Sequence, residues 1–187
     1  MHIFKRDNER IAFIHVPKTG GLSIVNFLHK NRFEFIHNEK NYNGLHTPFE
    51  VFKDLELDYD FCFSIFRDPI DRFTSALNYF YPTIEDYNQF IFEEIEKFDN
   101  LNDNINSVLF RPQIKYYPPK CKILKFEKIF TLKDFLQKNN IFIEGNLENF
   151  NQQKKKKIKL TSDTIRLLKI HFYEDYNLRN NFLFSDL

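Results

Sequence analysis

The sequence predicts an α/β fold in which helices flank a central, mainly parallel sheet, with residues 1–187 forming a single domain. Two observations predict this class. Short apolar runs rich in strand-forming residues alternate along the chain with segments whose apolar residues have helical spacing. One of these runs, Phe61–Phe66, is apolar at nearly every position, as expected for a parallel strand buried on both faces. The length of 187 residues suits one domain, and neither a repeat nor a linker divides it.

The first predicted unit is a strand, a glycine-containing loop and a helix. Residues Ile11–Val16 form a short run that favours a strand, and the Pro-Lys-Thr-Gly-Gly sequence at 17–21 ends it. From Leu22 to Lys30 the apolar residues recur at helical spacing, which predicts the helix.

Further elements follow in the same alternating order. The run Phe61–Phe66 leads into a helix that Pro69 opens at its first position and that extends to Phe80. Capping residues at 161–163 begin a last helix, expected from Asp163 to Tyr176. The other predicted elements are strands at 33–36 and 121–126 and helices at 48–55, 84–98 and 132–138.

Composition and charge exclude several classes of protein. The 27 Lys and Arg residues against 26 Asp and Glu leave a net charge of +1, so no overall field draws the chain to nucleic acid. No apolar run reaches the roughly 18 residues of a membrane span. The segment Met1–Arg10 is too polar for a secretory signal, and we therefore expect a cytoplasmic protein. Cys62 and Cys121 are too few for a disulfide scaffold or a cysteine-based zinc site, so we expect buried free thiols.

The loop Pro17-Lys18-Thr19-Gly20-Gly21-Leu22-Ser23 has the composition of an anion-binding loop. Glycines allow backbone N–H groups to approach an anion closely, and the following helix adds its dipole. Lys18 supplies a charge, while Thr19 and Ser23 supply hydroxyl donors. The loop resembles a P-loop, but its lysine precedes the glycine pair, which disfavours ordinary ATP or GTP hydrolysis. The alternative is a tight turn with a structural role alone.

The segment from Arg67 to Ser75 is the second candidate anion site. Arg67 follows a buried strand, at the end where open α/β sheets bind ligands. At helical spacing, Arg72, Ser75 and Tyr79 share one face, and we expect the opposite, apolar face to pack on the sheet. An arginine and a hydroxyl suit a phosphate monoester. The alternative is that Arg67 and Arg72 pair with Asp68 and Asp71.

Together the two segments make the chain resemble the sulfotransferases that use 3′-phosphoadenosine 5′-phosphosulfate (PAPS). It is most similar to carbohydrate sulfotransferases of the heparan sulfate 2-O-sulfotransferase type and their bacterial and viral relatives. The motif PKTGG-x-S is complete at Pro17–Ser23, and RDP-x-x-R-x-x-S is complete at Arg67–Ser75. Weaker similarities follow at 110–113, 124–127 and 160–178, where a Pro-Gln segment, a strand ending in glutamate and a Tyr…Asp-Tyr helix resemble the family.

The resemblance implies a P-loop NTPase-like central parallel sheet and transfer of a sulfuryl group to an acceptor hydroxyl. It implies that Pro17–Ser23 holds the 5′-phosphosulfate of PAPS, and that Arg67 and Ser75 hold its 3′-phosphate. Lys18 would stabilise charge on the leaving phosphate oxygen, so that adenosine 3′,5′-bisphosphate (PAP) is released. This chemistry requires no metal ion. The expected acceptor is a saccharide hydroxyl.

His46 is the expected catalytic base, because it lies between the two motifs, where the heparan sulfate 2-O type carries its catalytic histidine. A histidine near its ordinary pKa of about 6.5 suits proton abstraction at neutral pH. The alternative is a surface histidine capping the helix that begins after Pro48. His37 is a weaker candidate, and Glu50 is the fallback because other sulfotransferase branches use a glutamate.

The acceptor side is less defined by the sequence. The run Lys154–Lys157 is either a solvated loop or a basic segment that closes the nucleotide pocket and attracts a polyanionic acceptor. Tyrosines at 79, 81, 116 and 117 are candidates for stacking on sugar rings, against the alternative of packing. The chain is short for the family, so the acceptor cleft is expected to be either abbreviated or completed by a partner subunit, as in a homo-oligomer.

Two other functions are weighed against sulfotransfer. A nucleotide kinase or other P-loop phosphotransferase is disfavoured by the position of Lys18 and by the lack of a clear magnesium-ligating Asp after an apolar strand. A nucleic-acid-binding module is disfavoured by the near-neutral charge and by the lack of a recognisable binding motif. We therefore expect no nucleic-acid partner.

Overall fold

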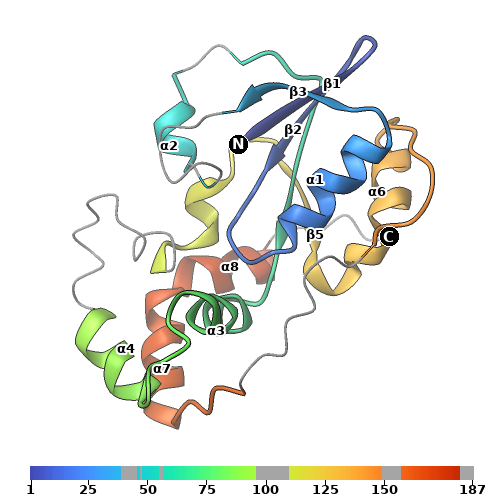
Figure 1. Cartoon of the computed structure of the whole chain (residues 1–187). Coiled ribbons are helices and arrows are strands. Elements are labelled where there is room, and N and C mark those ends of the chain that lie inside the picture. The colour runs from blue at the N-terminus through green and yellow to red at the C-terminus, as the bar shows by residue number, and fades with distance from the viewer. Residues whose placement is uncertain (39–45, 47, 55–56, 96–109, 149–156, 182–187) are drawn as a thin grey trace.

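A five-stranded sheet is the centre of the computed structural model, which describes residues 1–38, 46, 48–54, 57–95, 110–148 and 157–181 (Figure 1). The strand order is β3-β1-β2-β4-β5. The strands are β1 (His2–Arg6), β2 (Glu9–Ile14), β3 (Glu34–Asn38), β4 (Phe61–Phe66) and β5 (Lys122–Lys125). β2, β4 and β5 are parallel, whereas β1 is antiparallel to both of its neighbours. The fold is thus a mixed α/β domain, and its sheet is parallel in one half rather than throughout.

β1 is the strand that the sequence analysis missed. It pairs with β2 as a hairpin in which Arg6 lies opposite Glu9. The two residues between them are Asp7 and Asn8, and Asp7 has a φ of 52°. Asp and Asn tolerate the left-handed backbone of a two-residue hairpin turn, so this dipeptide was the available signal. The charged residues on either side of it obscured the pattern, because they lie at the exposed end of the hairpin.

Helices cover both faces of the sheet. They are α1 (Gly21–Lys30), α2 (Phe49–Phe52), α3 (Pro69–Phe80), α4 (Tyr87–Ile95), α6 (Leu132–Lys138), α7 (Ser162–His171) and α8 (Tyr173–Asn181), with the 3-10 helices η1 (Gln113–Tyr116) and η2 (Phe126–Thr131). The predicted strand at 61–66 and helices at 69–80 and 132–138 are confirmed at those residues. Within the described residues, none of these helices is both long and apolar enough to cross a lipid bilayer.

Alternate residues of β2 enter different cores, as the two-residue period of a strand requires. Ile11 and Phe13 join the core beneath α1 and α6, together with Phe63 of β4. Ala12 and Ile14 face the opposite side, where the core includes side chains from α2 and η1. This burial on both faces accounts for the continuous apolar runs that predicted the central strands.

The helices α3, α4 and α7 form a separate apolar cluster in the lower part of Figure 1. Phe73 and Leu77 of α3 are fully buried there against residues such as Ile91 and Leu168. The expectation that this face of α3 packs on the sheet was therefore wrong, because other helices bury it. The predicted last helix is also two helices, α7 and α8, which meet at Phe172.

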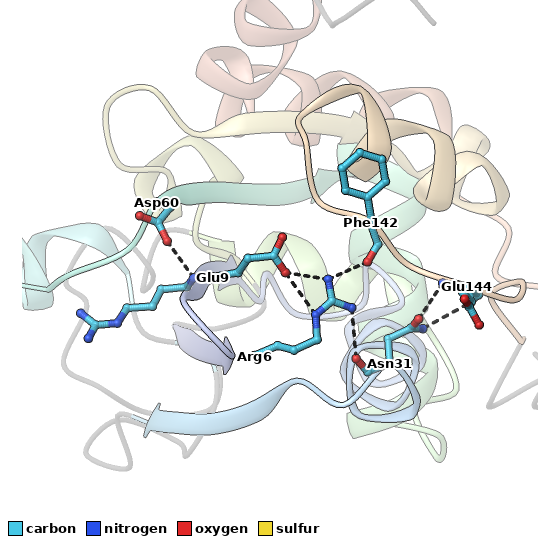
Figure 2. Close-up of polar contacts among 7 residues, drawn as sticks. Arg6, Glu9, Asn31, Asp60, Phe142 and Glu144 are labelled. Atoms are coloured by element: carbon cyan, nitrogen blue, oxygen red, sulfur yellow. Dashed lines mark hydrogen bonds and ion pairs between the residues drawn. The ribbon is translucent and has the colours of Figure 1, made fainter.

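Polar contacts fix the C-terminal end of α1 (Figure 2). The Arg6 guanidinium donates to the carbonyl oxygens of Asn31 at 3.3 Å and of Phe142 at 2.6 Å. The Asn31 side chain donates to Glu144 O at 3.2 Å and accepts from Glu144 N at 2.7 Å. These contacts fasten the segment around 142–144 across the end of α1. They therefore hold in place the helix whose other end follows the glycine loop.

The two cysteines lie on neighbouring parts of the sheet: Cys62 is in β4, and Cys121 directly precedes β5. Cys62 is buried, as expected, but Cys121 is partly exposed, and both are free thiols. Their side chains contact each other, and burial raises the pKa of Cys121 well above its ordinary value.

Candidate functional site

The two predicted anion loops leave the sheet at the same edge. β2 and β4 are adjacent and parallel, with Ile14 in register with Ser64, and the Ser64 hydroxyl donates to Ile14 O at 2.7 Å. The loop before α1 and the loop before α3 therefore begin side by side. They also touch, because Nη1 of Arg67 donates to the carbonyl oxygen of Lys18 at 3.1 Å.

Backbone geometry explains the residues of the first loop. Lys18 and Gly20 have φ values of 64° and 82°, in the left-handed region. A Cβ on Gly20 would lie 2.9 Å from Cδ1 of Ile129, so space as well as conformation favours glycine there. The buried Thr19 hydroxyl donates to Val16 O at 2.8 Å. This hydroxyl proton thus closes the loop and does not point to a ligand.

The N-terminus of α1 is open to an anion. Gly20 is its N-cap, and within the described chain no side chain caps the helix and no acidic residue occupies its first turn. Ser23 is buried, whereas Leu22 is exposed on the first turn. The partial positive charge of this helix end is therefore not neutralised by the helix's own residues.

The second glycine of the loop, Gly21, faces the side chain of His15, the residue that directly follows β2. A Cβ at this position would lie 1.9 Å from Nε2 of His15. The His15 ring is packed against His2, Phe13 and His46, with ring centroids 5.6, 5.6 and 4.5 Å away. The second glycine of the loop therefore exists because a buried imidazole occupies the space of a side chain.

A side-chain contact also joins the first loop to α3. The Lys18 ammonium lies 4.0 Å from the centroid of the Tyr79 ring, a cation–π contact. Tyr79 belongs to the third turn of α3 and is 55% exposed. The lysine is thus held at the surface of the molecule, between the first loop and α3.

Arg67 directly follows the carboxyl end of β4, as the sequence predicted, but α3 differs from the expectation. The Arg67 guanidinium stacks on the Phe126 ring at 4.6 Å, and its partial burial lowers the pKa of the side chain. The Asp68 carboxylate accepts from the amides of Ile70 and Asp71 at 3.0 and 3.1 Å. It therefore caps α3, so side chains rather than the α3 N-terminus would have to hold a phosphate here.

Arg72 and Ser75 are buried rather than presented on an open face. Arg72 is fully buried, donates to Arg111 O at 2.8 Å and lies 5.6 Å from the Phe172 ring centroid. Ser75 is 4% exposed. The residues of the predicted polar face of α3 therefore differ in exposure. Tyr79 is exposed, whereas Arg72 is buried because the segment before η1, at Arg111, and the junction of α7 and α8, at Phe172, cover it.

Gln113 and Asp175 hold the Arg67 backbone, and the sequence analysis assigned neither a role. Gln113 donates from Nε2 to Arg67 O at 2.8 Å and accepts at Oε1 from Arg67 N at 3.1 Å. The Asp175 carboxylate accepts from the amide nitrogens of Gln113 and Ile114, both at 2.9 Å. The available signal was the pair of weaker family similarities at 110–113 and 160–178, which contain these two residues.

His46 lies beside the first loop, but its pKa differs from the expectation. Its Nδ1 is 2.9 Å from the carbonyl oxygen of His15. Because a carbonyl only accepts, Nδ1 carries the proton and Nε2 retains its lone pair. Burial lowers the pKa of His46 to about 4, with further lowering by the N-terminus, Lys18 and Arg72. His46 is therefore neutral at pH 7, and it does not cap α2, for which no side-chain cap is found among the described residues.

The remaining candidates divide between surface, interior and undescribed residues. The exposed Glu50 of α2 pairs at 2.9 Å with Lys53, which directly follows this helix. Tyr116 is fully buried and so packs in the core. Most of the run Lys154–Lys157 and the side chain of His37 lie outside the described residues.

A cavity of about 1220 Å³ lies at the other end of α1 and is not part of this site. Its lining includes Lys5, Arg6, Lys30 and Arg32 but also Asp7, Glu34, Glu144 and Glu148. Such a balanced lining selects neither an anion nor a cation.

Comparisons of the chain with models of protein families, with curated protein sequences and with solved structures give no match. The assignment of a function therefore rests on the residues of this site.

Proposed function

We propose that this protein is a sulfotransferase that moves a sulfuryl group from PAPS to an acceptor hydroxyl, with a saccharide as the acceptor class. The observation that carries the proposal is the hydrogen bond from Arg67 to Lys18 O, 3.1 Å long, which joins two complete motifs at one edge of a parallel pair of strands. A ligand with two separated phosphate groups requires two such neighbouring anion sites. The same placement supports a P-loop NTPase-like arrangement of the parallel half of the sheet.

The residues present fit the donor. The glycine loop has left-handed backbone at Lys18 and Gly20, and it leads into a helix end that its own side chains leave uncapped. These features suit the 5′-phosphosulfate. Arg67 would hold the 3′-phosphate, and Ser75 would assist from the second turn of α3. Lys18, within the loop itself, would stabilise charge on a phosphate oxygen.

His46 is the proposed base for the acceptor hydroxyl. The His15 carbonyl selects the tautomer in which Nε2 can accept a proton. A pKa of about 4 makes the imidazole a weak base in the free protein. Since Lys18 and Arg72 contribute to this lowering, an anion held beside Lys18 would offset their charge and raise the pKa toward the value that proton abstraction needs. We expect the His46 resonances in an NMR titration to report a higher pKa in the presence of PAP.

Thermal unfolding in the presence of PAP tests the donor site. At a PAP concentration of about 100 times Kd, binding adds about 2.7 kcal/mol to the free energy of unfolding. For a domain of this size we expect the Tm to rise by about 5–10 °C. Arg67→Ala should remove most of this shift, whereas Arg166→Ala, at an exposed arginine of α7, should keep it. An unchanged Tm of the wild-type protein with PAP would overturn the proposal.

Transfer of label from PAPS to a panel of glycans, tyrosyl peptides and small alcohols tests the reaction. We expect turnover on a glycan that persists in EDTA, whereas phosphoryl transfer from ATP would stop. His46→Ala should abolish turnover and keep PAP binding. Turnover retained in this variant would assign the base to another residue, with Glu50 next to be tested.

A further inference from the structure

The C-terminal helix α8 reaches the Arg67 loop through a chain of buried hydrogen bonds. Asp175 and Gln113 are both fully buried. Asp175 accepts from the backbone of Gln113 and Ile114, and its Oδ2 also lies 3.4 Å from Nε2 of Gln113. Gln113 in turn pairs with both backbone polar groups of Arg67. The path therefore runs from α8 through the start of η1 to Arg67, the residue that follows β4.

The Gln113 amide has one orientation that satisfies all of its neighbours. Its NH₂ group faces two acceptors, Asp175 Oδ2 and Arg67 O, while its oxygen faces the N–H of Arg67. Turning the amide over would place its oxygen against a carboxylate and a carbonyl, and would leave the Arg67 N–H facing a donor. The Arg67 backbone already sets this orientation, and the Asp175 carboxylate, which only accepts, adds to the preference.

Because Gln113 holds the Arg67 backbone, the point from which the Arg67 side chain extends is fixed as well. Gln113 holds the N–H and the C=O of Arg67 as a neighbouring strand would, although β4 has already ended. The side chain can then reach Lys18 O at 3.1 Å and the Phe126 ring at 4.6 Å. Asp175 is buried at a cost that raises the pKa of its carboxyl, although Arg72 and the amides of Gln113 and Ile114 oppose this rise. At this cost the carboxylate keeps its two backbone partners, the amides of Gln113 and Ile114.

We propose that Asp175, acting through Gln113, is a positioning residue for Arg67, so that helix α8 sets how strongly the site discriminates for a 3′-phosphate. The ligand in this inference rests on the proposed function, whereas the positioning of the Arg67 backbone does not. Asp175→Asn replaces one carboxylate oxygen by an NH₂ group, which cannot accept from a backbone amide of Gln113 or Ile114, and should therefore loosen Gln113 and with it Arg67 without removing any group that touches the ligand. Glu174→Gln is the matched control, because Glu174 is the adjacent residue of α8 and its exposed carboxylate pairs with Lys115 of η1 at 3.0 Å.

Two measurements on the full chain test the proposal. In the first, the amide hydrogen exchange of Arg67 should accelerate at least about tenfold in Asp175→Asn, while exchange at Ile65 of β4 in the same variant stays unchanged. In the Glu174→Gln control, exchange at Arg67 should also stay unchanged. In the second, titration with PAP and with adenosine 5′-monophosphate gives the preference for the 3′-phosphate. We expect this preference to be about tenfold or more in the wild type and to fall within about threefold of unity in Asp175→Asn.

A structural role for Asp175 would lower the affinity for both nucleotides alike and would keep their ratio. Asp175→Asn should also leave the ratio unchanged when Arg67 is already alanine, because the two residues act on one contact. Unchanged exchange at Arg67 in a folded Asp175→Asn protein would overturn the positioning role, whatever the nucleotides do. Absence of PAP binding by the wild type would overturn the proposed function, and the exchange measurement would then decide the positioning role by itself.

Discussion

The clash between Gly21 and His15 gives a stability prediction that the structure makes quantitative. An added Cβ at Gly21 would lie 1.9 Å from Nε2 of His15, and a normal contact of about 3.5 Å would require the ring to move by about 1.6 Å. His2, Phe13 and His46 surround that ring, so its movement would disturb the core beside β1 and β2. Overpacking of this kind costs about 1–3 kcal/mol. We therefore expect Gly21→Ala to lower the Tm by about 3–10 °C.

A double-mutant cycle in urea isolates the contact. His15→Ala removes the ring, and Gly21→Ala in that background should be neutral or stabilising by up to about 1 kcal/mol, because alanine is the better helix former. The coupling free energy between the two positions, the difference between these two costs, should then be about 1–4 kcal/mol. Gly20→Ala is the control, since its cost comes from a φ of 82° and from the contact with Cδ1 of Ile129, and should persist without the His15 ring. An equal cost of Gly21→Ala in both backgrounds would refute the reasoning.

Three further predictions concern pH, capping and the anchoring of α1. Because burial lowers the pKa of His46 to about 4, the unfolded chain binds its proton first as pH falls. The contribution of His46 to the free energy of unfolding is fully present above about pH 6.5 and is lost toward pH 4, by at most about 3 kcal/mol. In His46→Gln, the free energy of unfolding from denaturation curves should therefore change less between these pH values. Thr161 accepts from Thr164 N at 3.2 Å as the cap of α7, so Thr161→Ala should lower the Tm by about 2–4 °C. The same change at Thr131, whose side chain does not cap α6, should cost less. Asn31→Ala removes the paired contacts with Glu144, and hydrogen exchange at the Glu144 amide should accelerate while that within β4 does not.

Local sequence signals located most of the elements near the site. The strand Phe61–Phe66 and the helix from Pro69 were predictable because a doubly buried strand is apolar throughout and proline favours the first position of a helix. The two motifs were predictable as neighbours, because strands separated by a helix are normally parallel and their ends meet at one edge.

Other features depended on contacts between distant residues. Helical spacing placed Arg72 on a polar face, but residues far along the chain, at 111 and 172, enclose it. The pKa of His46 departs from the ordinary value because residues remote in sequence bury it and place cations nearby. The faces of α3 were misjudged for the same reason, since helical periodicity identifies an apolar face but not the element that covers it.

The sequence by itself determined the α/β class, the order of most elements and the two complete motifs, because each depends on residues close together in the chain. The tertiary structure alone decided that Arg67 touches the Lys18 backbone, that a histidine ring enforces Gly21, and that Gln113 and Asp175 hold the Arg67 loop. The physical reason is that burial and hydrogen bonding are set by partners from other elements. The sequence contains those partner residues, but only folding brings them within contact distance.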